Sequence, residues 1–119
     1  MDRALIEILT PLCPEIHEQG TLAPDAPYPD RFFTFWNPAS DANKHYDNEA
    51  FGYVWEFDVN FYSTDPDDVY DTLDAARRLL LRNGWRVGGL GHSVASDHHT
   101  HTGRGFTASY LQIRKEITT

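Results

Sequence analysis

The chain has 119 residues and a mass of 13.6 kDa, with 40% hydrophobic, 13% aromatic and 24% charged residues. This composition is that of one globular domain over residues 1–119, and it excludes a disordered or fibrous protein. The 18 acidic and 10 basic side chains give a formal charge of -8, which disfavours specific nucleic-acid binding because such a surface must attract phosphates.

Cysteine content and hydropathy limit the compartment in which the protein is expected. Cys13 is the single cysteine, which excludes an internal disulfide and a zinc site built from cysteines. Acidic residues interrupt the apolar N-terminal stretch, and nowhere do about 18 apolar residues run together, so neither a signal peptide nor a membrane span is expected. We therefore expect a soluble protein made in the cytoplasm, with no membrane partner.

The first third of the chain predicts a helix, a connector and a strand. Apolar residues recur with helical spacing up to Leu12, and Pro11 clashes with a helical carbonyl, so the helix is expected to end near residue 10. Three prolines between Gly20 and Asp30 predict an extended connector. The aromatic segment RFFTFW then predicts a strand over 31–36.

The clearest signals lie in the middle of the chain. The polar stretch 39–49 has no apolar period and predicts a loop, whereas 52–62 alternates large apolar with polar residues and predicts a strand with one buried and one wet face. Asp65-Pro66 combines a capping acceptor with a proline suited to the first helical position. A helix is therefore expected from Asp65 to Asn83, with Gly84 as its left-handed stop.

The rest of the chain completes the expected fold. Strands are predicted around Trp85 and Val87, over 92–96 and over 105–114, with a glycine-rich bend between the first two. The helix stripe of Val69, Leu73, Ala76 and Leu80 should cover the sheet. The predicted fold class is α+β: a two-layer sandwich in which an N-terminal and a central helix pack on a mainly antiparallel sheet of about four to five strands.

No pattern of catalytic or cofactor-binding residues stands out. His98, His99 and His101 are the best metal candidate, but a zinc site needs a third or fourth rigid ligand, so solvated loop histidines are the favoured interpretation. Glu56 and Asp58 share one strand face, which alternation alone explains. We expect no catalytic residues, no bound metal and no cofactor.

Charge is distributed unevenly along the chain. Residues 1–75 contain 16 acids and 3 bases, a net -13, and residues 76–119 contain 2 acids and 7 bases, a net +5. On the central helix the acids precede the bases, which matches the helix dipole and allows Asp74 to pair with Arg78. The alternative to a merely solvated helix is that acidic and basic ends of neighbouring subunits meet head to tail. The expected assembly contacts are Asp67, Asp68, Asp71, Asp74, Arg77, Arg78, Arg82 and Arg86, with Leu79 or Leu81 at the apolar centre.

The order of elements resembles that of a known family. A proline-rich entry, the FFTFW strand, Tyr46-Asp47-Asn48-Glu49, the strand WEFDVNFYSTDP, a helix ending in LLRNG and a hairpin with Thr102-Gly103-Arg104 follow one another. Between about Pro14 and about Leu111 this arrangement is similar to small phage and prophage tail proteins of the tail-terminator or tail-completion (neck) type.

The resemblance implies a non-enzymatic α/β subunit of the virion that forms a ring, commonly a hexamer. Such a ring caps the tail tube and contacts the head-tail connector proteins. In that setting the hairpin carrying His98, His99, His101 and Arg104 is a candidate docking loop.

Two other functions remain open. One is a small metal-dependent enzyme that uses His98, His99 and His101, which a stoichiometric transition metal would reveal. The other is a monomeric binding module of a mobile element, which would stay monomeric at high concentration.

Overall fold

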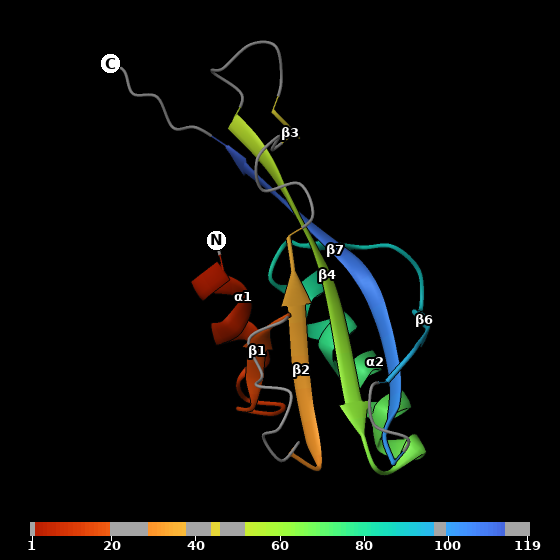
Figure 1. Cartoon of the computed structure of the whole chain (residues 1–119). Helices are drawn as coiled ribbons and strands as arrows, with labels where there is room; N and C mark the ends of the chain where they lie inside the picture. Colours follow the sequence, from red (N-terminus) through yellow and green to blue (C-terminus); the bar gives the residue numbers. More distant parts are fainter. Residues whose placement is uncertain (1, 20–28, 38–43, 46–51, 97–99, 114–119) are drawn as a thin grey trace, which may run out of the picture.

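Two helices cover one face of a mixed β-sheet in this α+β fold (Figure 1). The structure is a computed structural model that describes residues 2–19, 29–37, 44–45, 52–96 and 100–113. In chain order its elements are α1 (Asp2–Leu9), β1 (Ile16–Glu18), β2 (Arg31–Trp36), β3 (Lys44–His45), β4 (Gly52–Ser63), α2 (Pro66–Arg82), β5 (Arg86–Val87), β6 (His92–Val94) and β7 (Thr102–Ile113).

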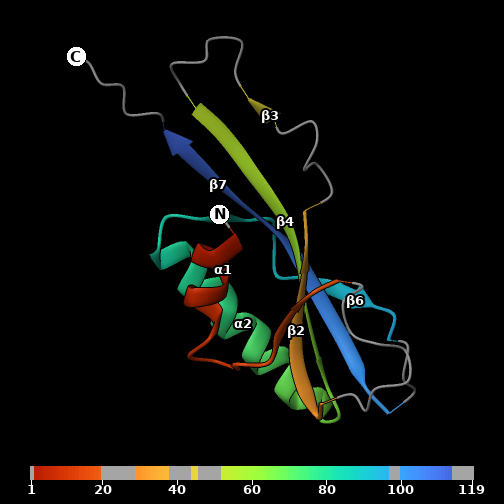
Figure 2. The ribbon, with the colours of Figure 1, turned by 60° about the vertical axis from the view of Figure 1, so that its left-hand side comes forward.

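The sheet is built around the pairing of its two longest strands. β4 and β7 run antiparallel over twelve residues each, from Gly52 opposite Ile113 to Ser63 opposite Thr102. The main order is β1-β2-β4-β7-β5, with β3 paired to β4 and β6 paired to β7. Figure 2 shows that one end of the β4–β7 pair projects beyond the two helices.

The core lies between the sheet and the helices. Phe57, Val59 and Phe61 of β4 are fully buried, and so are the residues Val69, Ala76 and Leu80 of the stripe on α2. Aromatic rings of neighbouring strands also pack together in this core: Phe33 of β2 and Phe61 of β4, which pair across the ladder, are 4.7 Å apart between ring centroids. The stripe expected on the central helix is confirmed.

Local signals explain where the helices begin and end. α1 ends at Leu9, two residues before Pro11, and the Cys13 amide still reaches the Leu9 carbonyl at 3.3 Å. The side chain of Asp65 caps α2 by accepting from the Asp67 amide at 3.0 Å. Gly84 follows with φ of +90°, the backbone region that favours glycine. The expected strands over 31–36 and 52–62 are also confirmed.

The structure corrects three expectations. In the part of the chain that the structure describes, the sheet has seven strands rather than four to five; it is mainly antiparallel, as expected, with β1 and β2 as its one parallel pair there. Lys44–His45 forms strand β3 within the stretch expected to be a loop. β7 begins at Thr102 rather than at 105, because its pairing with β4 continues to that residue. The connector expected over 20–30 lies largely outside the described residues.

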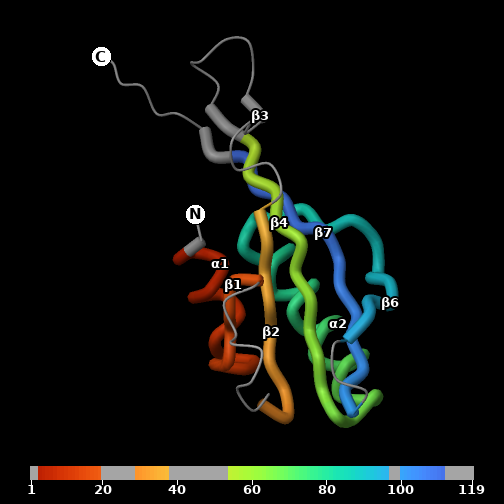
Figure 3. The backbone as a smooth tube through the Cα atoms, viewed as in Figure 1, coloured from red at the N-terminus to blue at the C-terminus, as the bar shows by residue number. Residues whose placement is uncertain are grey.

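The face of the sheet turned away from the helices is here called the outer face. It is less exposed to solvent than the alternation of apolar and polar residues in β4 predicts. Its polar β4 residues, including Glu56 and Asp58, are half-buried. Phe32 is only 2% exposed, because Tyr62 stacks on it at 5.1 Å and His101 meets it edge-on at 5.8 Å between centroids. Figure 3 views the molecule from the outer face, with β2, β4 and β7 side by side in front of α2.

Candidate assembly surfaces

The residues expected to make assembly contacts lie on different sides of α2. Successive residues of an α-helix are rotated by about 100° about its axis. The surface of α2 is therefore divided into the buried stripe, a strip on the opposite side of the helix and a flank on either side. The strip farthest from the sheet, here called the outer stripe, consists of Asp67, Asp71, Arg78 and Arg82, and all four are exposed. The sequence order therefore places two carboxylates at one end of the outer stripe and two guanidinium groups at the other.

Ion pairs within the helix use only part of this charge. Asp74 accepts from Arg77 at 2.9 Å and from Arg78 at 2.8 Å, which confirms the expected Asp74–Arg78 pair. The hydrogen bond from Arg77, together with the charge of Arg78, holds the pKa of Asp74 below its usual value. Within the described ranges, Asp67 and Asp71 make no ion pair, and neither does Arg82.

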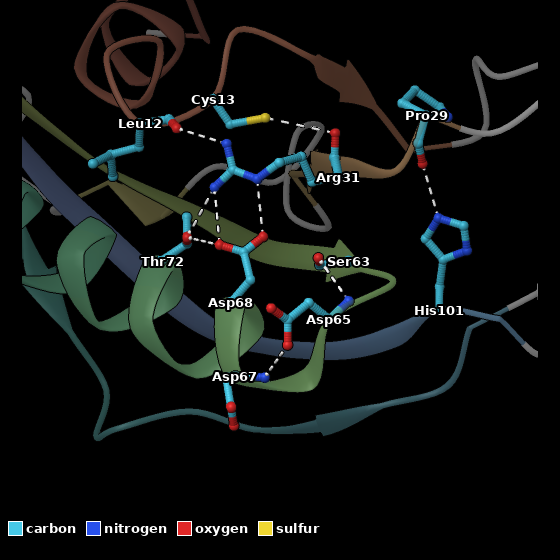
Figure 4. A network of polar contacts seen from close by, with 10 residues as sticks. All are labelled: Leu12, Cys13, Pro29, Arg31, Ser63, Asp65, Asp67, Asp68, Thr72 and His101. Atoms are coloured by element: carbon cyan, nitrogen blue, oxygen red, sulfur yellow. Dashed lines mark hydrogen bonds and ion pairs between the residues drawn. The ribbon is translucent and has the colours of Figure 1, made fainter.

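Asp68 faces away from the outer stripe and is used inside the subunit. Arg31 donates to its two carboxylate oxygens from Nε at 2.9 Å and from Nη2 at 3.1 Å, and Thr72 donates to it at 2.7 Å (Figure 4). Arg31 also donates to the Leu12 carbonyl at 3.2 Å, so it connects the segment after α1, the start of β2 and the first turns of α2.

This network changes the protonation of Asp68. The hydrogen bonds from Arg31 lower the pKa of Asp68 to about 2, and its hydrogen bonds with Thr72 and Ser63 act in the same direction. Sequence reasoning missed Arg31, because the two partners are 37 residues apart and an acid in a first helical turn already has a local explanation. The one feature of the sequence that could have indicated a role for Arg31 is its position at the start of a strand that contains four aromatic residues.

Apolar residues are exposed on one flank of α2. Tyr70 is 57% exposed and Leu81 45%, and their helical angles differ by about 20°. The guanidinium of Arg104 lies over the Tyr70 ring at 4.7 Å and donates to the Gly91 carbonyl at 2.8 Å. Arg104, one of the expected docking residues, therefore positions an exposed tyrosine.

Leu79 lies on the opposite flank. It lines an open groove of about 490 Å³ between α1 and α2, together with Ala4, Glu7, Ile8, Pro11 and Asn83. Of the two leucines expected near an interface, Leu81 is thus the exposed one and Leu79 is half-buried. Arg86 in β5 is exposed and pairs with Ser109, which places it on the outer face of the sheet.

His101 ties the start of β7 to the entry of β2. Its Nε2 lies 2.8 Å from the Pro29 carbonyl, so Nε2 donates this bond, and its Nδ1 lies 3.0 Å from the Thr100 hydroxyl. His98 and His99 lie outside the described residues. Among the residues that the structure describes, no three His, Cys, Asp or Glu side chains gather where they would hold a metal ion.

The outer face carries a second set of exposed apolar residues. Trp36 is 42% exposed and Leu111 43%. They lie near acidic side chains, because Trp36 pairs with Asp58 across the β2–β4 ladder, and Leu111 pairs with Val54, two residues before Glu56. Exposed apolar side chains therefore occur on both layers of the molecule.

No protein-family model matches this chain, and no curated protein does. In the described part of the chain, no helix has the length and apolar character needed to span a membrane.

Proposed function

We propose that this protein is a structural component of a phage or prophage tail. It assembles into a ring, as a hexamer, at the head-proximal end of the tail, and it joins the tail tube to the head-tail connector proteins. It has no catalytic role in this proposal, resides in the host cytoplasm before assembly and in the virion neck afterwards, and works through contacts between subunits.

The observation that carries the proposal is the pair of exposed surfaces on opposite layers. The helix layer presents Tyr70, Leu81 and the charges of α2, and the outer face presents Trp36 and Leu111 beside acidic residues. A ring with cyclic symmetry needs two different surfaces on each subunit, because each copy contacts its two neighbours through different patches. A molecule with one binding partner needs only one such surface.

The composition of both surfaces suits protein contacts. Tyrosine, tryptophan and arginine dominate the binding energy of protein interfaces, and an arginine already stacked on an exposed tyrosine loses less freedom on binding. Tyr70 and Arg104 meet this description on one layer, and Trp36 meets it on the other. A standard interface buries roughly 800 Å² per partner, an area that one helix face or one sheet face of this subunit can supply.

Charge reversal tests the role of α2 in assembly. Arg78→Glu combined with Arg82→Glu is expected to weaken self-association, because both side chains are exposed and Arg82 has no ion-pair partner within the described residues. Size-exclusion chromatography with light scattering measures the assembly, and circular dichroism confirms that the subunit stays folded. Arg3→Glu, at an exposed base of α1, is the control. Unchanged assembly of the double variant would remove α2 from the interface.

Electron microscopy tests the tail role itself. Purified protein incubated with tail tubes polymerised from a phage tail-tube protein is expected to add a ring at one end of each tube. A chain that remains monomeric at high concentration and leaves the tubes unchanged would instead favour the binding-module function.

A further inference from the structure

The outer stripe of α2 is complementary in charge to a second copy of itself that runs in the opposite direction. Asp67 lies seven residues before Asp74, and Arg82 lies seven residues after Ala75. Asp71 lies three residues before Asp74, and Arg78 three residues after Ala75. A two-fold axis between positions 74 and 75 therefore exchanges each acidic position of the stripe with a basic one.

We infer that a second copy of this chain docks antiparallel on the outer stripe, with its α2 facing the α2 of the first. Asp67 of each copy then lies opposite Arg82 of the other, and Asp71 lies opposite Arg78. The inference deepens the proposed function and rests on it in one respect, namely that copies of the chain contact each other through α2.

Geometry allows all four side chains to take part at once. At 100° per residue the four positions fall within about 60° of the helix circumference, so they face one partner. The two acids and the two bases are each separated by one helical turn, about 6 Å, which gives both halves the same spacing. All four are exposed, and the side chain of Arg78 is 68% exposed although it also contacts Asp74.

The charges of the outer stripe have little use inside the subunit. Among described residues Asp67, Asp71 and Arg82 have no ion-pair partner. The helix dipole stabilises acids near the N-terminal end of α2 and bases near its C-terminal end. This effect does not require the acids and bases to lie at matching positions on one strip of the helix surface. A second copy supplies a partner for every one of them.

The exposed apolar flank fits the same arrangement. A two-fold axis perpendicular to the helix keeps each flank on the same side, so Tyr70 of one copy faces the flank that carries Leu81 of the other. The two side chains are offset by only two residues along the helix axis, about 3 Å, so they lie at nearly the same level on the same side of the pair. Tyr70 and Leu81 are 57% and 45% exposed, and Arg104 already orients the tyrosine ring.

The symmetry of this contact differs from the head-to-tail contact that the charge order suggested. A two-fold contact is closed, because both copies use the same patch, and it joins copies only in pairs. Such a closed pair cannot join successive subunits of a cyclic ring, so within the proposed function it holds free subunits before assembly. The pair separates when the α2 layer of one subunit meets the outer face, with Trp36 and Leu111, of the next around the ring. A contact made by one helix of 17 residues belongs to the small, weak class, so the pairs are expected to dissociate on dilution.

A disulfide experiment reports the symmetry directly. In the two-fold pair, position 74 lies one residue from its own counterpart along the helix axis, so the Asp74→Cys variant should cross-link to itself under mild oxidation. In a head-to-tail contact a residue does not meet its own copy. The control is Asp67→Cys, on the same exposed strip but about 22 Å from its counterpart in the pair. Cys13 is 2% exposed and is common to both variants.

Charge exchange provides the second arm. Asp67→Lys with Asp71→Lys makes the stripe wholly basic, and Arg78→Glu with Arg82→Glu makes it wholly acidic. Each double variant alone should dimerise at least about tenfold more weakly than the parent chain, and an equimolar mixture should form heterodimers of parental affinity. Analytical ultracentrifugation measures the affinities, and native mass spectrometry identifies the pairs.

The outcomes separate this inference from the proposed function. Disulfide dimers of Asp74→Cys but not of Asp67→Cys, together with heterodimers in the mixture, support the two-fold contact whether or not the protein binds tail tubes. A different result would be that rings form on tail tubes but Asp74→Cys cross-links no more than Asp67→Cys. That result would overturn the two-fold contact and leave the tail function supported. Equal dimerisation by the parent and both charge variants would also overturn it.

Discussion

Replacing Asp68 by asparagine should destabilise the fold by removing the ion pair between α2 and β2. The substitution keeps the size of the side chain but removes the charge that receives two hydrogen bonds from Arg31. Arg31 then has only neutral acceptors: the Leu12 carbonyl, the Thr72 hydroxyl and the single amide oxygen of the new asparagine. The expected consequence is a looser connection between the two layers at the start of β2.

The size of the effect follows from the protonation of Asp68. A pKa lowered from 3.8 to about 2 corresponds to an upper bound of about 2.4 kcal/mol at neutral pH. The side chains of Asp68 and Arg31 are 23% and 40% exposed, so solvent screening reduces this to about 1–2 kcal/mol. For a chain of this length, that loss lowers the melting temperature by about 4–8 °C.

The pH dependence has a definite sign. Because the pKa of Asp68 is lower in the folded state, the folded chain releases this proton more readily than the unfolded chain. The stabilisation is complete above about pH 5, falls to just over half at about pH 3, and disappears as the pH drops through about 2. The difference in stability between Asp68→Asn and the parent chain should shrink over the same interval.

Urea unfolding followed by tryptophan fluorescence measures these differences, since Trp85 is 4% exposed in the folded state. Asp67→Asn is the matched control, because Asp67 lies in the same first turn of α2 but has no ion-pair partner within the described residues. A difference between the two variants of less than about 0.5 kcal/mol at pH 7, or one that does not change down to pH 3, would refute the assigned role of Arg31 and Asp68.

Three further outcomes test other parts of the structure. Gly105→Ala should cost about 1–3 kcal/mol of unfolding free energy in urea titrations, because the added Cβ would meet the β4 backbone at 2.8 Å, whereas in Gly88→Ala the nearest atom is 3.8 Å away. Gly84→Ala should cost about 1–2 kcal/mol in the same assay, because its φ of +90° strains any other residue although space is available. Elemental analysis should find no stoichiometric transition metal, because both ring nitrogens of His101 already make hydrogen bonds, to Thr100 and to the Pro29 carbonyl. One metal ion per chain would instead favour the metal-dependent enzyme.

The elements predicted correctly are those with strong local signals. The alternation over 52–62 and the proline and capping acid before α2 specify structure within one element, so no knowledge of partners is required. β1 has only three residues and exists because it pairs in parallel with β2, each residue with a partner 17 positions further along the chain. β3, with two residues, likewise depends on β4. Short strands of this kind carry no periodicity that a sequence can display.

Sequence patterns predicted which charged residues form the candidate surface, but not how these residues are arranged in space. Helical spacing predicted the Asp74–Arg78 pair and the exposure of one leucine beside Leu80. It did not reveal that Asp68 turns inward to Arg31, because that contact joins two elements. It also gave the position of Tyr70 on the helix but not the guanidinium of Arg104 stacked on its ring.

The long central ladder has a consequence for how the chain folds. Partners in the β4–β7 pair are separated by between 39 residues (Ser63 to Thr102) and 61 residues (Gly52 to Ile113). Such distant pairing requires costly loop closure, which places the protein among slow folders, on the millisecond to second scale. During synthesis the hydrophobic layer cannot close until β7 has left the ribosome. Until then α2 and β4 expose their apolar faces together, and this is the interval in which the nascent chain is most prone to aggregate.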